Sequence, residues 1–354
     1  MSSIHISDVK AFRQCRRKWS WSSPLRDNLE PMVIYAPFFT GRAIHAALEF
    51  FYRDGVPFNK TVDTFLNSEE VNMDQLEALW PMEEKALDEQ IFLIRQLIDH
   101  YALWTAQDRS KYSDANLEFI SLEEQFELPM PLPGGGFHDT ITIGGRLDGM
   151  VKHKDTGKLW IWETKTAKAI GGLVNTLSND EQCGLYIYAA RQMWGDEVEG
   201  MLYNVIGKTP PAQPKVLDSG LLSQNKQANT SSFFFLRAVW EEHPDWTDET
   251  IQEHYGGFIE SLREKNQKFF RRHPVYRTNA ELKILMEGIY WTGMEMLSPM
   301  LFPYAAPGWF SCGFCSFKAP CLAMNMGADY RVLLREEYQT RVSATSMREE
   351  AKSE

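Results

Sequence analysis

Two strand-like stretches joined by a short turn constrain the fold more than any other feature. Residues 140–152 and 158–166 are rich in apolar and β-branched side chains, and Asp155-Thr156-Gly157 lies between them. Glycine is favoured where a tight turn needs a positive φ angle, so the pattern predicts a β-hairpin. A sheet is therefore expected in the middle of the chain.

Helical and strand-like segments alternate around this hairpin. Helices are expected at residues 7–21, 40–53, 72–104, 179–194, 248–270 and 279–297, and further strands at 119–128, 199–206 and 233–239. Ser7 is the expected N-cap of the first helix, where apolar side chains recur at spacings of three and four. Residues 209–232, rich in Pro, Ser, Asn and Gln, are expected to form a long loop or flap. The mixture predicts an α/β protein.

Glu163 and Lys165 stand two residues apart in the second strand of the hairpin. Because side chains alternate along a strand, these two share one face, and Trp160, Trp162 and Thr164 share the other. An isolated Glu-x-Lys is more often a surface ion pair than a catalytic group. Here the pair follows a strongly apolar run, which places it at the end of a buried strand.

Asp148 lies in the first strand of the hairpin, close to Gly144, Gly145 and Gly149. If the two strands pair in register, its carboxylate approaches Glu163. Two converging carboxylates suit hard cations such as Mg²⁺ or Mn²⁺. Such a cation activates water and relieves the charge on a phosphate, and a nearby lysine can orient or deprotonate that water. The constellation is typical of phosphodiester hydrolysis.

Two helical segments carry further polar residues. His45 lies in an amphipathic segment that reads Gly41-Arg42-Ala43-Ile44-His45. Gln182 and Tyr186 are four residues apart and therefore share one face of a later helix. Taken singly, a helix histidine is more often structural than a ligand, and the Gln–Tyr pair is an ordinary polar stripe.

The chain has five cysteines, of which Cys312, Cys315 and Cys321 fall within ten residues. An odd number, without an apolar leader at the N-terminus, argues against a disulfide framework. Three thiolates need a fourth ligand, for which Cys15 and Cys183 are the candidates. Four thiolates hold either zinc or an iron–sulfur cluster, and spacing alone leaves both open. Cys183 by itself is better interpreted as a buried thiol.

The net charge of −11 argues mildly against a nucleic-acid partner, which usually binds a basic face. Two local runs are nevertheless basic: Lys10, Arg13, Arg16, Arg17 and Lys18, and Arg263, Lys265, Lys268, Arg271, Arg272 and Arg277. Each run is equally well interpreted as a solvated helix face. Because the sequence has neither an apolar run of membrane-spanning length nor a signal peptide, we expect a cytoplasmic protein without a membrane partner. If a virus encodes the protein, the expected location is the cytoplasm of the host.

Taken in order, these motifs resemble those of the PD-(D/E)XK nucleases of the RecB type. The segment 41–45 resembles the family's helix histidine, Gly145-Arg146-Leu147-Asp148 its metal-binding aspartate, Glu163-Thr164-Lys165 its acidic-x-lysine strand, and Gln182 with Tyr186 its Gln-x-x-x-Tyr helix. Their order and their helix–strand–strand–helix context match as well. The resemblance implies a restriction-endonuclease-like α/β core, with a mixed central sheet flanked by helices, helical additions and a C-terminal cysteine cluster.

The resemblance also implies a role for each motif residue. The expected ligands of Mg²⁺ or Mn²⁺ are His45, Asp148, Glu163 and the Thr164 backbone carbonyl. The expected catalytic residues are Asp148, Glu163, Lys165, Gln182 and Tyr186. Lys165 would assist the attacking water, whereas Gln182 and Tyr186 would position the substrate strand or support the site.

A subgroup of these nucleases, which includes AddB and the CRISPR-adaptation nucleases, carries one cysteine before the nuclease motifs and three after them. Cys15, followed by Cys312, Cys315 and Cys321, resembles that pattern, although Arg16 stands where a proline is common. In the subgroup the four cysteines bind a [4Fe–4S] cluster, so the resemblance implies that cofactor, with structural Zn²⁺ as the alternative.

We therefore expect a metal-dependent DNA nuclease, in particular an exonuclease that acts in DNA repair, recombination or replication, on single-stranded DNA or on free ends. The alternative is a non-catalytic DNA-binding or assembly subunit that keeps the nuclease fold. Because the chain has no phosphate-loop motif, a helicase or recombination partner would be a separate protein.

Four sections are expected along the chain. Residues 1–116 form a helical section with Cys15 and His45, and residues 117–240 form the nuclease core sheet and motif helix. Residues 241–330 hold the C-terminal helices and the iron–sulfur cysteine segment. Residues 331–354 form a polar tail, the end of which is expected to be disordered.

Overall fold

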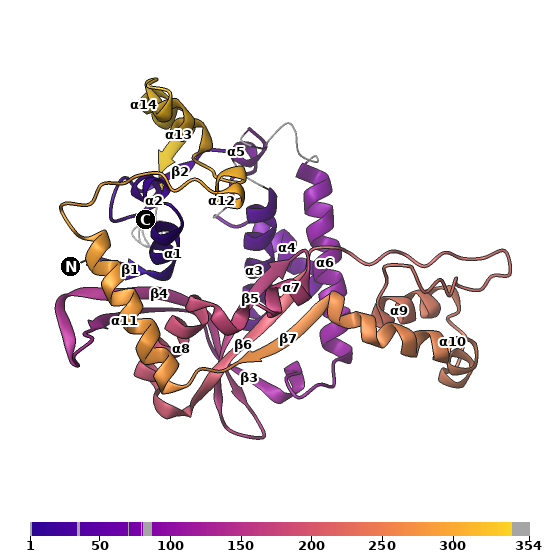
Figure 1. The fold of residues 1–354 in the computed structure, drawn as a ribbon. Helices are drawn as coiled ribbons and strands as arrows, with labels where there is room; N and C mark the ends of the chain where they lie inside the picture. The colour runs from indigo at the N-terminus through magenta and orange to yellow at the C-terminus, as the bar shows by residue number, and fades with distance from the viewer. Residues whose placement is uncertain (1, 34–35, 70, 79, 81–86, 342–354) are drawn as a thin grey trace.

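A mixed β-sheet lies at the centre of the protein, with helices on both of its faces (Figure 1). The computed structural model describes residues 2–33, 36–69, 71–78, 80 and 87–341. Six strands make the sheet, in the order β1-β4-β5-β6-β7, and β3 also pairs with β4. The expected α/β class, with a mixed sheet flanked by helices, is confirmed.

The strands of this sheet run in both directions. They are β1 (Ser2–His5), β3 (Leu117–Pro131), β4 (Phe137–His153), β5 (Leu159–Ala167), β6 (Val198–Gly207) and β7 (Phe270–Val275). β4 and β5 form the predicted antiparallel hairpin, with Gly157 in the turn at a φ of 69°. β5 and β6 are parallel, and β7 is antiparallel to β6. A second, two-stranded sheet pairs β2 (Leu29–Pro31) with β8 (Tyr338–Thr340).

One edge of β4 is shared by two strands that do not meet. β1 pairs with residues 141–144 of β4, and β5 pairs with residues 149–152. β3 runs along β4 through almost the same range and takes the other edge. Residues 145–148 are therefore left without a strand partner on the side that β1 and β5 share. This gap in the pairing is where the candidate site lies.

Six α-helices are described before the hairpin. They are α1 (Ile6–Gln14), α2 (Arg16–Ser22), α3 (Ala36–Asp54), α4 (Phe58–Leu66), α5 (Met73–Ala78) and α6 (Leu87–Gln107). The first predicted helix is interrupted at Cys15, which has extended backbone angles. His5, not Ser7, occupies the N-cap position of α1, so that expectation was wrong. The predicted helix at 72–104 is described as α5 and α6, and residues 79 and 81–86 lie outside the described part.

The helices after the hairpin include the motif helix. They are α7 (Ile170–Val174), α8 (Glu181–Trp194), α9 (Ser232–Glu242), α10 (Asp248–Arg263), α11 (Asn279–Met296), α12 (Trp309–Gly313), α13 (Lys318–Asn325) and α14 (Tyr330–Glu337). Figure 1 shows α9 and α10 projecting sideways from the sheet as a separate lobe. The preceding segment is a long loop up to residue 231, as predicted, with one isolated bridge between Val216 and Leu222.

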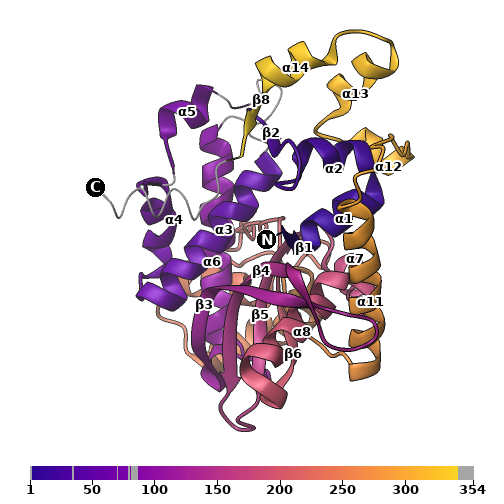
Figure 2. The same cartoon turned by 90° about the vertical axis from the view of Figure 1, so that its left-hand side faces the viewer.

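Apolar side chains on the two faces of the sheet build separate parts of the core. Ile161 and Met201 belong to the cluster that α1, α8 and α11 cover. Trp160 and Trp162 point to the opposite face, where Trp162 meets Tyr52 of α3. This alternation along β5 confirms that Trp160 and Trp162 share the face opposite to Ile161. Figure 2 shows α3 and α6 standing against one side of the sheet and α8 and α11 against the other.

The expected strand at 233–239 is a helix, so that prediction was wrong. Ser231 caps α9 by accepting a hydrogen bond from the Phe234 N–H, at 3.1 Å. Phe235 and Val239 then lie one helical turn apart and pack into a small core with Tyr255 of α10. An apolar run of this length fits a strand or a helix, and here the cap and the partner helix decide between them.

Strand β7 was missed because its sequence, FRRHPV, resembles the basic helix before it. The helix expected to reach residue 270 ends at Arg263. The tail also holds more structure than expected, since residues 330–340 form α14 and β8. Tyr338 stacks on Phe317, and Trp21 of α2 belongs to the same cluster. The end of the tail, residues 342–354, lies outside the described residues.

Candidate active site

Asp148 sits at the gap in the pairing of β4. The last pair between β4 and β5 is Gly149 with Trp162, and beyond it Asp148 Oδ2 accepts a hydrogen bond from the backbone N–H of Thr164, at 2.8 Å. The side chain thereby replaces the next bond of the ladder. Its negative charge also reaches Glu163, the preceding residue of β5, and contributes to that residue's raised pKa. The structure thus brings the two predicted carboxylates together.

Glu163 is almost fully buried, at 1% exposure, and two side chains hold one of its oxygens. Oε1 accepts hydrogen bonds from the Lys165 ammonium and from Gln182 Nε2, the second at 2.9 Å. The other oxygen, Oε2, is buried and has no hydrogen-bond partner among the described residues. A buried acceptor without a donor is costly unless something outside the chain satisfies it.

The electrostatics of the site disfavour a second charged carboxylate. Two carboxylates, Asp148 and Glu163, share the one ammonium of Lys165. Burial, and after it the charge of Asp148, raise the pKa of Glu163 above its ordinary value. Burial acts to lower the pKa of Lys165, but the charges of Glu163 and Asp148 outweigh it and the pKa is raised. Lys165 is therefore a firmly protonated ammonium, whereas the charged form of Glu163 is disfavoured without a further cation nearby.

His45 reaches the same point from α3. Its Nδ1 lies 3.4 Å from Asp148 Oδ2, and its ring also forms a hydrogen bond with the backbone of Thr164. Burial lowers the pKa of His45, so a neutral imidazole is favoured. A neutral imidazole can act as a metal ligand. The four predicted ligand groups therefore converge from α3, β4 and β5.

Helix α8 brings its two motif residues to the site in different ways. Gln182 contacts Glu163 directly. Tyr186 is buried against the ring of Phe126 with an edge-to-face geometry, and burial together with the charge of Glu163 raises its pKa to about 12. A protonated phenol that packs in this way supports the site. The predicted contact of either residue with a substrate strand stays a prediction.

Asp180 positions this helix, and the sequence analysis did not single it out. Its carboxylate caps α8 by accepting hydrogen bonds from the backbone N–H groups of Gln182 and Cys183, at 2.7 and 3.2 Å. Lys10 of α1 forms an ion pair with it at 3.3 Å. The available signal was an acidic residue just before the helix, at the position where N-caps occur.

A second pair missed from the sequence flanks Asp148. Arg146 Nε lies 2.7 Å from Glu123 Oε2, across β3 and β4. Glu123 has a φ of 56°, which is unusual for a residue other than glycine. Arg146 was visible within the quoted aspartate motif, whereas nothing in the sequence marks Glu123.

Near Arg146 and Glu123, the side chains of β4 change the face of the sheet to which they point. A side chain at Gly145 would meet Phe126 and Tyr186, on the α8 side, whereas one at Gly149 would meet Leu122 and Trp162, on the opposite side. Residues four apart in a regular strand keep the same face, so the facing changes between Gly145 and Gly149. Asp148, which lies within this stretch, is thereby placed beside β5.

The donor set fits a divalent cation of the Mg²⁺ or Mn²⁺ type. It offers two acidic side chains and a backbone carbonyl, one buried carboxyl oxygen lacks a donor, and a cation would favour the charged form of Glu163. Within the described residues, however, no three His, Cys, Asp or Glu side chains are grouped as a metal ion requires. In this structure the donors instead bond one another, His45 with Asp148 and Lys165 with Glu163.

The cysteines separate into a group and an outlier. Burial raises the pKa of the Cys315 thiol, and the neighbouring Cys15 and Cys321 raise it further, so these three lie close together although Cys15 is almost the whole chain away. Arg17 Nη1 donates to Cys321 Sγ at 3.3 Å, and the Gly308 N–H donates to Cys312 Sγ at 3.4 Å. Such donors stabilise metal-bound thiolates.

Cys183 lies in the core, where its thiol donates to the Tyr203 hydroxyl at 3.3 Å. Burial raises its pKa to about 12, as suits an ordinary buried thiol. Cys15, rather than Cys183, thus lies near Cys315 and Cys321, although no three cysteines among the described residues are grouped as a metal ion requires.

Three residues of the first basic run, Lys10, Arg13 and Arg16, form ion pairs within the protein. Lys10 pairs with Asp180, Arg13 with Glu181 and Arg16 with Glu295, which ties α1 and α2 to α8 and α11.

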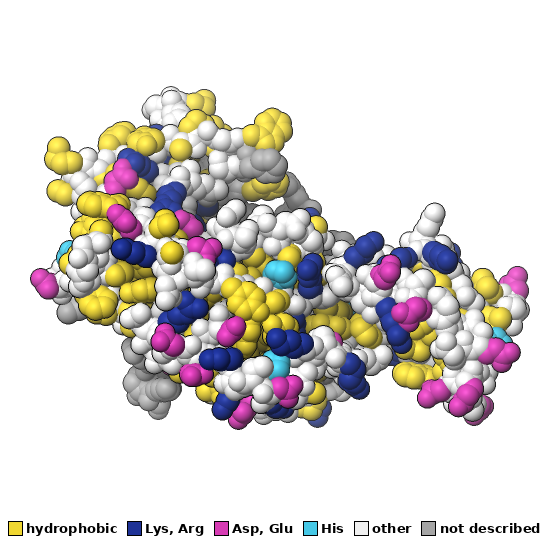
Figure 3. Space-filling model, turned by 60° about the horizontal axis from the view of Figure 1, so that its bottom comes forward, with side chains coloured by type: hydrophobic (Ala, Val, Ile, Leu, Met, Phe, Trp, Pro, Cys, Tyr) yellow, Lys and Arg dark blue, Asp and Glu magenta, His cyan; other side chains and the backbone are white. Residues whose placement is uncertain are grey.

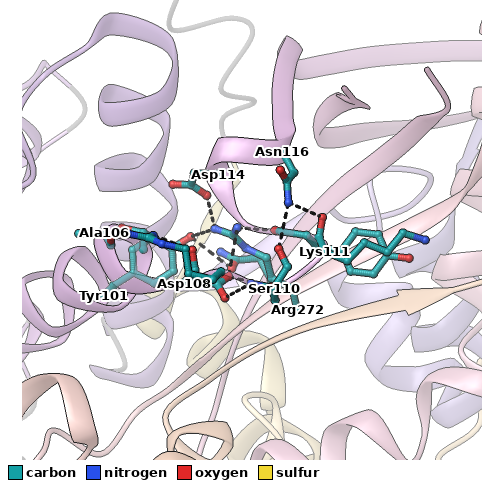
Figure 4. A network of polar contacts seen from close by, with 12 residues as sticks. Tyr101, Ala106, Asp108, Ser110, Lys111, Asp114, Asn116 and Arg272 are labelled. Carbon is teal, nitrogen blue, oxygen red and sulfur yellow. Dashed lines mark hydrogen bonds and ion pairs between the residues drawn. The ribbon is translucent and has the colours of Figure 1, made fainter. Parts of the chain in front are cut away.

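The second run is dispersed over α10, a short 3₁₀ turn, β7 and the loop that follows it. Its member Arg272 has a side chain that is 2% exposed and pairs with Asp114, as part of the network in Figure 4. Its guanidinium also lies over the rings of Trp104 and Trp162. The face shown in Figure 3 likewise carries Lys and Arg beside Asp and Glu, rather than a field of one sign.

Comparison with known proteins agrees with this geometry. The family model of the PD-(D/E)XK nuclease superfamily matches residues 4–322. Because the match extends over most of the chain, the protein belongs to the PD-(D/E)XK nuclease superfamily. Members are nucleases that use divalent metal ions such as Mg²⁺ or Mn²⁺, and membership implies DNA as the substrate class. No curated protein matches the chain. Among the described helices, none is long and apolar enough to cross a membrane.

Proposed function

We propose that the protein is a Mg²⁺- or Mn²⁺-dependent DNA exonuclease. The observation that carries the proposal is the convergence of Asp148, Glu163 and Lys165 at one point, with Glu163 buried and one of its oxygens unsatisfied. The motifs resemble those of RecB-type nucleases, which supports action on single-stranded DNA or on free ends in repair, recombination or replication. The four sections expected along the chain belong to the same proposal.

Each residue has a physical task in this proposal. His45, Asp148, Glu163 and the Thr164 carbonyl would hold the cation, which would supply neutralising charge to the phosphate and activate a water. Lys165, a protonated ammonium, orients the attacking water and neutralises charge that develops on the phosphate. Gln182 keeps Glu163 in place through the bond to Oε1, and Tyr186 fills the space behind it.

The cysteine group belongs to the same proposal. Cys15, Cys312, Cys315 and Cys321 would hold a [4Fe–4S] cluster, with a structural Zn²⁺ as the alternative. Support comes from the closeness of Cys15, Cys315 and Cys321 and from the N–H donors directed at two of the sulfurs. A cluster at this place would brace α1 and α2 against the C-terminal segment, much as a crosslink over a long loop does.

Cellular context follows from the chemistry. None of the five cysteines forms a disulfide in this structure, which suits a reducing compartment, so we place the protein in the cytoplasm where DNA is available. A helicase or recombination partner would be a separate chain.

Digestion of end-labelled single- and double-stranded DNA, with free or blocked ends, tests the proposal. In Mg²⁺ or Mn²⁺ the wild type is expected to shorten free ends progressively, and Glu163→Ala and Lys165→Ala are expected to abolish this. The matched control is the exposed ion pair Lys158–Glu197, at 3.2 Å, on the turn side of the same hairpin. Lys158→Ala and Glu197→Ala should cleave like the wild type.

Three results would count against all or part of the proposal. Equal digestion by wild type, Glu163→Ala and Lys165→Ala would mean that the site is misassigned. Tight DNA binding with unchanged DNA in both metals would favour a non-catalytic DNA-binding or assembly subunit instead. If DNA with blocked ends is cleaved as fast as DNA with free ends, the protein is still a nuclease but not an exonuclease.

A further inference from the structure

Arg146 and Glu123 form an unequal ion pair beside the candidate site. The Arg146 Nε to Glu123 Oε2 distance is 2.7 Å, the Glu123 side chain is 12% exposed, and the Arg146 side chain is 48% exposed. The mostly buried carboxylate therefore attracts a guanidinium that reaches solvent. An arginine has five N–H donors, so a contact through Nε leaves donors for a second anion.

The backbone of Glu123 shows that this arrangement is built at a cost. Its φ of 56° lies in the left-handed region, where a side chain clashes and glycine is tolerated. Strain of this kind persists where the surroundings impose it, often beside functional groups. A glycine would suit the backbone better but could not hold Arg146. The glutamate side chain, rather than a relaxed backbone, is therefore the useful feature of this position.

Arg146 lies near the candidate metal ligands, because its charge acts on His45, whose Nδ1 is 3.4 Å from Asp148 Oδ2. Arg146 and Asp148 are two apart in β4, so their backbones are separated by at most about 7 Å. That is of the same order as the spacing of successive phosphates along a nucleic-acid strand. Glu123 and Leu122 belong to the stretch of β3 that lies opposite Asp148 and Gly149, so the pair sits at the point where β4 changes its facing.

We propose that Arg146, held by Glu123, forms a second phosphate subsite, which binds a DNA phosphate adjacent to the one that is cleaved. The proposal rests on the proposed nuclease function of the Asp148–Glu163–Lys165 site. Arg146 is a substrate-positioning residue here, and Glu123 positions Arg146. The planar, bidentate donors of arginine suit a phosphodiester, which explains an arginine rather than a lysine at this place.

A substrate with one neutral linkage tests the subsite. Oligonucleotides carry a single methylphosphonate at successive positions beside the cleaved bond, and kcat and KM are measured for each. In the wild type, one adjacent position is expected to raise KM by about 10- to 100-fold, as the loss of a charged hydrogen bond does. Arg146→Ala should show a similar rise in KM with unmodified DNA, and the methylphosphonate at that position should then have little further effect.

The control variant is Arg341→Ala. Arg341 is 46% exposed and pairs with Glu30 at 3.2 Å, so it matches Arg146 in exposure and in its acidic partner, but it lies beside the small β2–β8 sheet. It should respond to the methylphosphonate as the wild type does. An equal methylphosphonate penalty in wild type and Arg146→Ala at every position would overturn the subsite.

Binding measurements separate this proposal from the nuclease proposal. Fluorescence anisotropy of the same oligonucleotides with Glu163→Gln protein needs no cleavage, and it compares that variant with the double variant Glu163→Gln, Arg146→Ala. Absence of cleavage by the wild type would contradict the proposed nuclease. A position-specific binding penalty that disappears with Arg146→Ala would still support the subsite, and a penalty that is unchanged would overturn it.

Glu123→Gly provides a readout that a purely structural role would not give. Because glycine accepts the positive φ, this variant should melt at the same temperature as the wild type or higher. Its KM should nevertheless rise, although less than in Arg146→Ala, since the arginine remains but is no longer held. A lower melting temperature with an unchanged KM would show that Glu123 serves the fold alone and would overturn its positioning role.

Discussion

The backbone N–H of Thr164 donates to Asp148 Oδ2 at 2.8 Å, one step beyond the last paired residues of β4 and β5. Asp148 is thereby tied to the backbone of the residue that follows Glu163. The separation of the two carboxylates is set by a strand rather than by flexible side chains. A site built on strands holds its groups more firmly than one built on loops.

Asp148→Asn should separate charge from structure at this position. The amide oxygen can still accept the Thr164 N–H, so the free energy of unfolding should change by no more than about 1 kcal/mol. Metal-dependent cleavage should fall by about 100-fold or more, because the site loses a carboxylate. Kinetics with chemical denaturation of the same samples check both parts. Asp155→Asn, in the exposed turn of the hairpin, is the control, and wild-type activity of Asp148→Asn would contradict the assignment.

Acidification should destabilise the protein partly through His100. Burial, and then the charge of Arg237, lower the pKa of this histidine to about 3, and its Nε2 lies 2.6 Å from Ser231 Oγ. The unfolded chain has a histidine pKa of about 6.5 and so binds the proton first. The stabilisation is therefore complete above about pH 6.5 and is lost as the pH falls towards 3.

His100→Gln is the variant that tests this pH dependence. It should be less stable than the wild type at about pH 8, where the neutral histidine contributes most, and the difference should shrink towards about pH 5. Urea unfolding at each pH measures it. Since His100 lies beside the N-terminus of α9, away from the carboxylates, DNA cleavage at neutral pH should be retained. A difference that grows as the pH falls would contradict the sign.

Arg272→Met should be among the most destabilising single changes in β7. The guanidinium bonds Asp114 (Figure 4) and the Tyr112 carbonyl. It also lies 4.9 Å from the ring centroids of Trp104 and Trp162. Removing one partner of a buried ion pair typically costs about 3 to 5 kcal/mol. Arg271→Met, at the half-buried neighbouring position, should cost about 0.5 kcal/mol. Denaturant unfolding decides, and equal effects at the two positions would contradict the buried network.

Replacement of single cysteines should distinguish cluster ligands from core thiols. Protein purified without oxygen should be coloured and contain iron, and Cys15→Ser or Cys315→Ser should lose most of it. Cys183→Ser is the matched control, because this thiol bonds Tyr203 inside the core and should leave the iron content unchanged. Metal analysis and the visible spectrum provide the measurement. A colourless protein that contains one zinc ion would contradict the iron–sulfur cluster and favour a structural Zn²⁺ site.

Local patterns allowed much of the fold to be predicted. The β4–β5 hairpin follows from two β-rich runs and a glycine turn, and α8 follows from its apolar spacing. Errors arose where one run fits two structures, as at Phe235 in α9, or where a strand is basic, as at Arg272 in β7. In both cases contacts with distant elements supplied the missing free energy: α10 packs against α9, and Asp114 and two tryptophans surround Arg272.

By itself, the sequence determined which groups are available for chemistry and in what order. Asp148, Glu163 and Lys165 were visible because strand alternation and the hairpin bring them together over a short stretch of chain. Only the tertiary structure decided that Gln182 bonds Glu163, that Cys15 lies beside Cys315, and that Glu123 adopts a positive φ opposite Asp148. These relations depend on packing between segments that local propensity does not link, so no reading of neighbouring residues contains them.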